Sequence, residues 1–238
     1  MTQQTTSGAR TPPNAIITGA SRGLGLALAS VLVVEGWRVV IDARTTPELD
    51  RAARRLGPAA VAVPGDVTDP DHRSALLAAA AAPGRLDLLV NNGGILGPSP
   101  LPPVAALPVA ALRELYEVNV VAPLALTQAA LPALRTAGGV LVFITSDAAV
   151  EPYQGWGGYG SAKAALERLS AGLAAEEPAV TTWTLDPGDL RTRMHQQAFP
   201  GQDISDRPLP AAVAPGLVAM LAERPASGRY RLADWLPS

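Results

Sequence analysis

A tyrosine and a lysine stand four residues apart in the segment Tyr159-Gly-Ser-Ala-Lys163. On a helix this spacing places both side chains on one face. A free phenol has a pKa of about 10, too high for efficient proton exchange at neutral pH. An ammonium ~5 Å away, at an effective dielectric constant of ~20, would lower that pKa by roughly two. The pair can therefore exchange a proton with a substrate, although such a pair on a helix is more often surface packing.

Two other polar residues could complete a proton-transfer site. Ser146 ends a β-branched run before Tyr159, and its hydroxyl could polarise a substrate carbonyl. Asn119 falls inside a segment expected to be helical, where asparagine is unfavourable unless its side chain has a task. A kink in that helix is the alternative interpretation of Asn119.

A glycine-rich segment, Thr18-Gly-Ala-Ser-Arg-Gly-Leu-Gly25, lies between a β-branched run and a helical one. Glycines let the backbone turn sharply and approach a pyrophosphate without a Cβ clash. The helix that follows offers free N–H groups and the positive end of its dipole. This position predicts a nucleotide phosphate site, whereas glycines elsewhere often only turn the chain.

Short β-branched runs alternate along the chain with longer helical ones, which predicts a parallel sheet with helices on both faces. The expected fold class is α/β, a single Rossmann-like, doubly wound domain of about seven strands. We expect this domain at 13–238, after a loose tail at 1–12. Strands are expected at 14–18, 38–42, 60–63, 86–90, 140–145, 180–185 and 228–232. Helices are expected at 23–35, 47–56, from 70 onward, 109–134, 159–176 and 211–223, with 188–210 irregular.

Ligands of such sheets bind beyond the carboxyl ends of the strands. The segment Asn91-Asn-Gly-Gly94 ends the fourth expected strand, although it could be only a turn. Asp66-Val67 ends the third, where Asp66 could equally be a cap or loop residue. The segment Pro187-Gly-Asp-Leu-Arg-Thr192 ends the sixth.

In this order and spacing, the segments resemble the short-chain dehydrogenase/reductase family over residues 14–231. The resemblance implies hydride transfer between a nicotinamide cofactor and a carbonyl or secondary alcohol. It implies a catalytic set of Asn119, Ser146, Tyr159 and Lys163, with Tyr159 as the acid or base, Lys163 lowering its pKa and Asn119 supporting a proton path. The implied cofactor contacts are Gly19, Ser21, Arg22, Gly23, Leu24, Arg44, Asp66, Val67, Asn91, Gly93, Tyr159, Lys163, Pro187, Gly188, Leu190 and Thr192.

The end of the second expected strand bears on the choice of cofactor. By resemblance, NAD-preferring relatives place an acid where Ala43 falls, and NADP-preferring ones place a base where Arg44 falls. Arg22 could join Arg44 in clamping a 2′-phosphate through charge-assisted hydrogen bonds. These features favour NADP(H). NAD(H) is the alternative if both arginines are merely solvated, or if Asp42 takes the acidic position.

The substrate is expected to be a small carbonyl or alcohol compound held under a lid at 189–210. His195 could instead be a solvated lid residue, and Trp156 could equally be packing. A 3-oxoacyl-carrier-protein reductase is less favoured, because the stretches Ala137-Gly-Gly139 and Glu176-Glu-Pro178 lack the arginines that dock a carrier. The expected substrate contacts are Leu96, Asp147, Gln154, Trp156 and His195.

Composition narrows the function classes. The chain has 19 basic and 21 acidic residues, a net charge of −2, which gives no electrostatic case for nucleic acid or an anionic membrane. No apolar run is expected to reach the ~18 residues of a membrane span. With no cysteine and only two histidines, a metal site is not expected and a reducing cytoplasm suits the chain.

The function that the resemblance implies, with NADP(H) favoured at the end of the second expected strand, is an NADPH-dependent carbonyl reductase. An NAD-dependent secondary-alcohol dehydrogenase and a non-catalytic NADP-binding regulator are the alternatives. By resemblance, the helices that carry Asn119 and Tyr159 would form the interface of a homodimer or homotetramer. Their apolar positions are Leu112, Leu115, Leu124, Leu126, Leu166, Leu169 and Leu173, some of which must lie in the core.

Overall fold

The computed structural model describes residues 11–81 and 84–236, so most of the expected tail at 1–12 lies outside the described residues. Seven strands form one sheet in the order β3-β2-β1-β4-β5-β6-β7, and every neighbouring pair is parallel. This confirms the predicted α/β fold with a doubly wound parallel sheet. The strands are β1 (Asn14–Ile17), β2 (Arg38–Ala43), β3 (Ala60–Pro64), β4 (Leu88–Asn91), β5 (Val140–Ile144), β6 (Thr181–Asp186) and β7 (Gly228–Arg231).

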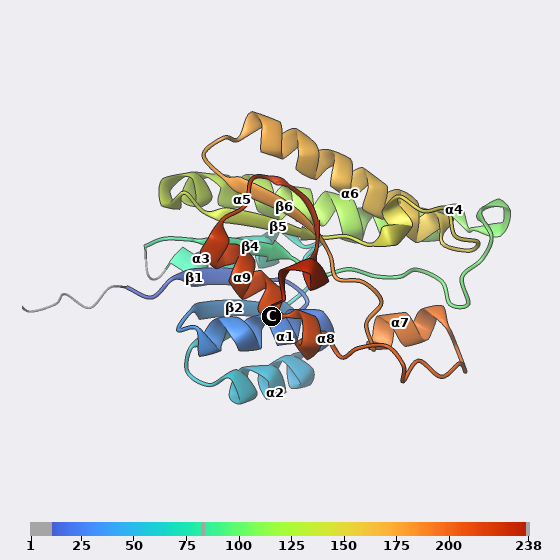
Figure 1. The fold of residues 1–238 in the computed structure, drawn as a ribbon, viewed down its shortest axis with the longest axis horizontal. Coiled ribbons are helices and arrows are strands. Elements are labelled where there is room, and N and C mark those ends of the chain that lie inside the picture. Colours follow the sequence, from blue (N-terminus) through green and yellow to red (C-terminus); the bar gives the residue numbers. More distant parts are fainter. Residues whose placement is uncertain (1–10, 82–83, 237–238) are drawn as a thin grey trace, which may run out of the picture.

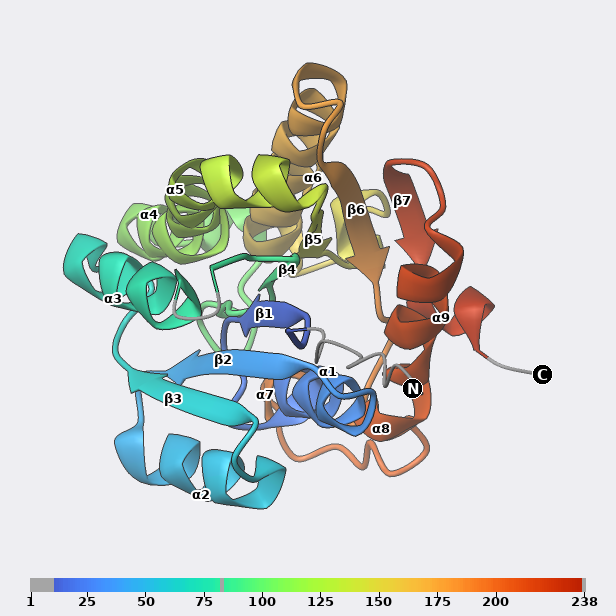
Figure 2. The ribbon, with the colours of Figure 1, turned by 90° about the vertical axis from the view of Figure 1, so that its left-hand side faces the viewer.

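The central strands are apolar because both faces of the sheet are covered. All residues of β1, β4 and β5 are buried, as expected for strands packed between two helical layers. One face is covered by α1 (Gly23–Val34), α2 (Thr46–Leu56), α8 (Pro210–Val213) and α9 (Pro215–Glu223). The other is covered by α3 (Pro70–Ala81), α4 (Val109–Tyr116), α5 (Ala122–Ala137) and α6 (Gly157–Glu176), and Figure 2 shows both layers.

The strand order reverses direction at β1, because the chain runs outward through β2 and β3 and then returns to β4 on the other side of β1. At such a switch point the connections leave in opposite directions, which opens a crevice at the carboxyl ends of the strands. In Figure 1 the segment with α7 (Arg193–Ala198) and the connection leading into α4 both lie at this end of the sheet. The fold therefore directs several loops toward one place.

Three elements differ from the sequence prediction. The helix expected at 109–134 is divided into α4, a π-helical turn at Glu117–Val121, and α5. The segment expected to be irregular contains α7, which is too short to show helical periodicity in the sequence. The last expected helix divides into α8 and α9 before Pro215, a residue that suits the first turn of a new helix.

The joined stretch Val109–Ala137 is long and apolar enough to cross a membrane by length and composition, with a mean hydropathy of 1.2 in its window. This corrects the expectation that no apolar run reaches that length. Half of the window is buried inside the protein, where Leu126, Leu131 and Leu134 pack in the core. A core helix of a globular protein meets the same criterion, so the stretch is weak support for a membrane span.

Candidate active site

A cavity of about 1050 Å³ lies at the carboxyl ends of the central strands. It is at the upper end of the volumes typical of ligand sites. The glycine turn after β1 lines one part of it, and Tyr159 and Lys163 of α6 line another. Two motifs that are far apart in the sequence therefore share one cavity.

The glycine turn is built for a close backbone approach. Gly19 has a φ of +67°, and a Cβ there would lie 2.8 Å from the Cα of Gly93 at the end of β4. The Thr18 hydroxyl accepts hydrogen bonds from the backbone N–H groups of Asn92 (3.0 Å) and Gly93 (2.8 Å). This part of the site therefore needs a residue without a side chain at position 19.

The start of α1 faces the same cavity. The residue before its first turn, Arg22, makes no side-chain cap with the helix. The first backbone N–H groups of the helix, which have no partner within it, are therefore not taken by a cap. Together with the positive end of the helix dipole, they fit the phosphates of a dinucleotide. Ser21, Gly23 and Leu24 line the cavity here.

The Tyr159 and Lys163 side chains lie together on α6, as their spacing predicts, and both are buried. The Nζ atom of Lys163 lies 5.5 Å from the centroid of the tyrosine ring. It donates a hydrogen bond of 2.8 Å to the carbonyl of Ile144, the last residue of β5. Lys163 is also the only lysine in the chain.

Burial dominates the acid–base properties of this pair. It lowers the pKa of Lys163 to about 8, against a smaller opposing effect of the Glu167 carboxylate. At pH 7 the amine is therefore still mostly an ammonium. Burial, with smaller contributions from Asp147 and Asp186, raises the pKa of the Tyr159 phenol. This corrects the expectation of a net lowering, because the loss of hydration outweighs the attraction of the neighbouring ammonium.

Ser146 follows β5 and begins the short helical turn Asp147–Ala149. Its hydroxyl donates to the Asp147 carboxylate (2.9 Å) and accepts from the backbone N–H of Ala148 (3.2 Å). The other oxygen of Asp147 accepts a hydrogen bond from the Tyr153 hydroxyl at 3.0 Å. Ser146, Asp147 and Tyr153 all line the cavity, so this turn presents a polar edge beside Tyr159.

Asn119 lies in the π-helical turn and is buried behind the cavity wall. Its amide donates to the carbonyl of Ile95 and accepts from the N–H of the same residue, both at 2.9 Å. A Cβ at Gly94 would lie 2.8 Å from the Asn119 Oδ1 and 3.9 Å from the Lys163 Nζ. Asn119 and Lys163 are therefore neighbours across a glycine, and the irregular turn is explained by the two hydrogen bonds of Asn119.

The far end of the cavity is lined by Ala43, Arg44, Asp66 and Val67. Arg22 forms an ion pair with Glu48 of α2. The Asp66 carboxylate accepts hydrogen bonds from the backbone and hydroxyl of Thr68 at 3.0 and 2.9 Å. Two arginines therefore line this end of the cavity: Arg44 follows β2, and Arg22, just before α1, already has an acidic partner.

Asp42 is buried beside these residues, with 3% of its surface exposed. One carboxylate oxygen accepts the backbone N–H of Gly19 at 2.6 Å, and the other contacts the Nε2 of buried His72 at 3.0 Å. Both oxygens of Asp42 are therefore engaged inside the protein. Neither the contact with His72 nor the ion pair of Arg22 with Glu48 was visible in the sequence, because both join separate helices to the site.

The substrate end of the cavity has an aromatic wall. The ring of Trp156 lies edge-on to Tyr159 at 5.8 Å and packs against Phe199 at 6.2 Å. Phe199 in turn contacts the ring of His195 at 4.9 Å. His195 is buried, and its Nε2 has no hydrogen-bond partner among the described residues. The histidine is therefore not the solvated lid residue of the alternative interpretation.

The structure brings most of the predicted residues to the cavity. Pro187, Gly188, Leu190 and Thr192 line it, as do Leu96 and Gly93. Asn91 does not, because its side chain is turned away and donates to the Thr127 hydroxyl of α5 at 3.1 Å. Its neighbour Asn92 lines the cavity instead. Gln154 is exposed and does not line the cavity. Tyr153 and Phe199, which are not among the predicted substrate contacts, do line it.

No metal centre accompanies these residues in the part of the chain that the structure describes. Residues 11–81 and 84–236 contain no group of three histidine, aspartate or glutamate side chains placed to hold a metal ion. The chemistry suggested by the arrangement is proton transfer at Tyr159, beside a cavity that fits a dinucleotide.

The doubly wound sheet, the uncapped glycine turn and the buried Tyr159–Lys163 pair define an oxidoreductase that uses a nicotinamide dinucleotide. The chain belongs to the short-chain dehydrogenase family, whose model matches residues 13–203 with the description "short chain dehydrogenase". It is accordingly an NAD(P)-dependent dehydrogenase or reductase.

Among individual proteins, the chain is 36% identical to serine 3-dehydrogenase of Agrobacterium fabrum, over 74% of this chain and 72% of the relative. A short-chain dehydrogenase structure from Shigella flexneri complexed with NADP superposes with a TM-score of 0.85 at 26% identity, covering 92% and 96% of the two chains. A 3-ketoacyl-(acyl-carrier-protein) reductase from Brucella melitensis complexed with NADH gives 0.83 at 26% identity, with the same coverage. The two structures hold different dinucleotides, NADP in one and NADH in the other.

Proposed function

We propose that the protein is an NADPH-dependent reductase that converts a ketone to a secondary alcohol, with Tyr159 as the proton donor. The observation that carries the choice of cofactor is the end of β2. There Asp42, Ala43 and Arg44 all line the cavity, but both oxygens of the Asp42 carboxylate are already engaged, one with the Gly19 N–H and the other with His72. A free ribose-binding carboxylate is thus lacking at Asp42, and a guanidinium suited to a 2′-phosphate is present at Arg44.

The residues present fit a dinucleotide along the whole cavity. The open N-terminus of α1 and the glycine turn suit the pyrophosphate, and Asp66 with Val67 suits the adenine. Gly188, with a φ of +71°, allows the segment after β6 to turn beside the nicotinamide end. When bound, the dinucleotide supplies the hydride.

The polypeptide positions the carbonyl and controls the proton. Because the pKa of Tyr159 is raised, its phenol stays protonated at neutral pH and is ready to donate to the alkoxide oxygen that forms. The Ser146 hydroxyl can orient the carbonyl, and the Lys163 ammonium provides positive charge beside the phenol. Asn119 supports this arrangement from behind Gly94, consistent with a role in a proton path to Lys163.

The ion pair between Arg22 and Glu48 favours the alternative cofactor. A guanidinium already paired with a carboxylate has less to offer a phosphate, and Glu48 brings negative charge close to the 2′ position. If Arg44 alone binds the 2′-phosphate too weakly, the protein is instead an NAD-dependent secondary-alcohol dehydrogenase that uses the same catalytic residues. A direct comparison of the two cofactors distinguishes these functions.

Replacing Arg44 with alanine tests the cofactor assignment. Losing a charge-assisted hydrogen bond worth about 1.5–3 kcal/mol should weaken NADPH binding roughly 10–100-fold. NADH binding should change little, because NADH lacks the 2′-phosphate. The measurement is the dissociation constant of each cofactor by fluorescence titration. Arg51→Ala is the matched control, because it removes the same charge from an exposed position on α2. Stronger binding of NADH than NADPH by the wild-type protein would contradict the assignment.

The aromatic wall of Trp156 and Phe199 favours a ketone with an apolar or aromatic substituent, and the free Nε2 of His195 offers a partner to a second polar group. Leu96 and Asp147 border the same space. A panel of ketones and alcohols, followed through NADPH absorbance, is the experiment that tests the reaction class. If none of them turns over, while NADPH binds tightly, a non-catalytic regulator is the better description.

The remaining parts of the proposal concern organisation. We propose that 13–238 act as one catalytic domain, with 189–210 as a lid that includes α7. The lack of cysteine suits a cytoplasmic location.

Three of the seven leucines on the Asn119 and Tyr159 helices (Leu115, Leu126 and Leu166) lie in the core, and the others are partly exposed. That remaining apolar surface is compatible with a homodimer or homotetramer.

A further inference from the structure

We propose that Arg229, near the C-terminal end of the chain, is a positioning residue for the reaction. We infer that it holds the end of β6 against α6 and balances two carboxylates beside Tyr159 and Lys163. The inference rests on the proposed function, because it assigns Arg229 a task in the same site. Arg229 belongs to β7, the edge strand, and does not line the cavity.

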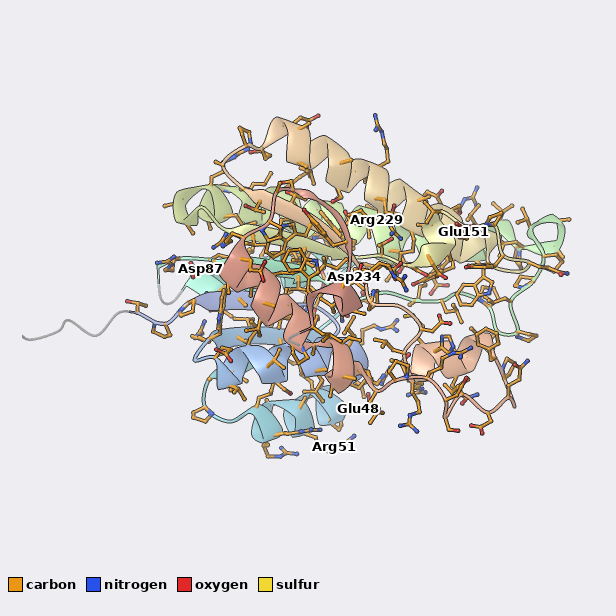
Figure 3. All side chains as sticks on the ribbon, viewed as in Figure 1. Glu48, Arg51, Asp87, Glu151, Arg229 and Asp234 are labelled. Atoms are coloured by element: carbon orange, nitrogen blue, oxygen red, sulfur yellow. The ribbon has the colours of Figure 1, made fainter. Side chains whose placement is uncertain are left out.

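The guanidinium of Arg229 joins two separate elements to its own strand. Its Nε donates to Glu167 of α6 at 3.0 Å, and one of its terminal nitrogens donates to Asp186 of β6 at 3.1 Å. The same terminal nitrogen lies 3.4 Å from the carbonyl oxygen of Ser146. Figure 3 labels Arg229 in this region between the sheet and α6. One side chain thus connects α6, the turn after β5 and the last residue of β6 to β7.

Both carboxylates that Arg229 contacts also hold parts of the site. Glu167 accepts a hydrogen bond of 2.6 Å from the hydroxyl of Thr145, the residue before Ser146, and lies one helical turn after Lys163. The second oxygen of Asp186 accepts the backbone N–H of Gly188 at 2.9 Å, at the start of the segment proposed to meet the nicotinamide. Arg229 therefore steadies both Ser146 and the Gly188 turn through these partners.

The charges around the catalytic pair explain the electrostatic part of this task. The carboxylates that act on it are Asp147 from the turn after β5, Asp186 from β6 and Glu167 from α6. Arg229 forms ion pairs with two of them, Glu167 and Asp186. If Arg229 were replaced by a neutral residue, the negative charges of Asp186 and Glu167 would be less well compensated. Added negative potential favours the ammonium and disfavours the phenolate, so the pKa values of both Lys163 and Tyr159 should rise.

The single lysine of the chain makes this effect directly measurable. In protein labelled with ¹³Cε-lysine, only Lys163 gives a lysine signal, so its pKa can be read by NMR without cofactor or substrate. We expect Arg229→Gln to raise that pKa by roughly 0.5–1. The pH–rate profile for ketone reduction should move toward higher pH. Because the variant also loses the hydrogen bonds that steady Ser146 and the Gly188 turn, kcat at pH 7 should fall on the order of five-fold. The KM for the ketone should be nearly unchanged.

Two further variants separate charge from structure. Arg229→Lys keeps the charge but loses the two-pronged contact, so it should restore the pKa of Lys163 to near the wild-type value and kcat only in part. Arg231→Gln removes an exposed arginine from the same strand, one with no ion pair among the described residues, and should move neither quantity.

The outcomes distinguish this inference from the proposed function. An unchanged pKa of Lys163 in Arg229→Gln, with the thermal midpoint close to wild type, would overturn the role of Arg229. An equal shift of that pKa in Arg231→Gln would overturn it as well. If the pKa rises as expected but the wild-type protein reduces no ketone, the electrostatic effect of Arg229 on Lys163 stands and the proposed reaction falls.

Discussion

Replacing Tyr159 with phenylalanine should lower the rate of ketone reduction by about 10²–10⁴-fold, the usual contribution of a positioned general acid. The substitution removes only the hydroxyl, and the ring keeps its edge-on contact with Trp156. Within the described residues the hydroxyl makes no hydrogen bond, so the folded structure should lose little stability. The measurement is the steady-state rate with NADPH and any ketone that the wild-type protein accepts.

The control for this variant is NADPH binding, which should remain within a few-fold of wild type. A loss of binding together with activity would mean that the variant reports on the cofactor site rather than on proton transfer. Tyr159→Phe with unchanged turnover would assign the proton to another group, and Asp147 or Ser146 would be the next to test. Unchanged turnover is therefore the result that would contradict the assignment of Tyr159 as the acid.

Gly19→Ala is expected to be the most damaging small substitution in the site. An alanine at a φ of +67° costs about 1–2 kcal/mol. Its Cβ would also meet the Cα of Gly93 at 2.8 Å, and this overpacking adds about 1–3 kcal/mol. For a chain of this size, the total corresponds to a fall in thermal midpoint of roughly 4–20 °C. NADPH binding should weaken too, because the turn that approaches the pyrophosphate must move.

Gly36→Ala is the matched control for the contact. Gly36 has a φ of +80°, yet a Cβ there would meet no atom within 4 Å. Its alanine variant therefore carries the backbone strain alone and should leave NADPH binding unchanged. The difference between the two thermal midpoints measures the close approach of the glycine turn to β4. Equal midpoints and equal binding would show that this approach is not tight.

Much of the fold could be predicted because its determinants are local. Strands buried on both faces appear as apolar runs, and the alternation with helices indicates parallel order. The missed features depend on tertiary contacts. The π-helical turn forms because Asn119 reaches Ile95 in a different loop, and α7 is held by the Thr192 hydroxyl, which accepts the N–H of His195 at 3.1 Å. Neither contact leaves a periodic pattern in the sequence.

The site residues were predicted best where their spacing along a helix fixes their geometry. They were predicted worst where the face of the strand to which a side chain points decides whether it reaches the cavity. Tyr159 and Lys163 meet because four residues make about one helical turn. In Asn91-Asn92, successive side chains of an extended chain point to opposite faces, and the sequence does not say which one meets the cavity. The pKa of Tyr159 was mistaken in direction because the extent of its burial depends on the packing of Trp156 and the surrounding chain.

The π-helical turn at Glu117–Val121 also bears on how this helix could be redesigned. A π turn contains one residue more than an α-helical path, which rotates everything after it by about 100°. Deleting a single valine there would convert α4, the turn and α5 into one regular α-helix. It would also rotate α4 relative to α5 and break the two hydrogen bonds between Asn119 and Ile95. A deletion that makes this helix more regular is therefore expected to lower the proposed reductase activity, because Asn119 would leave its place beside Lys163.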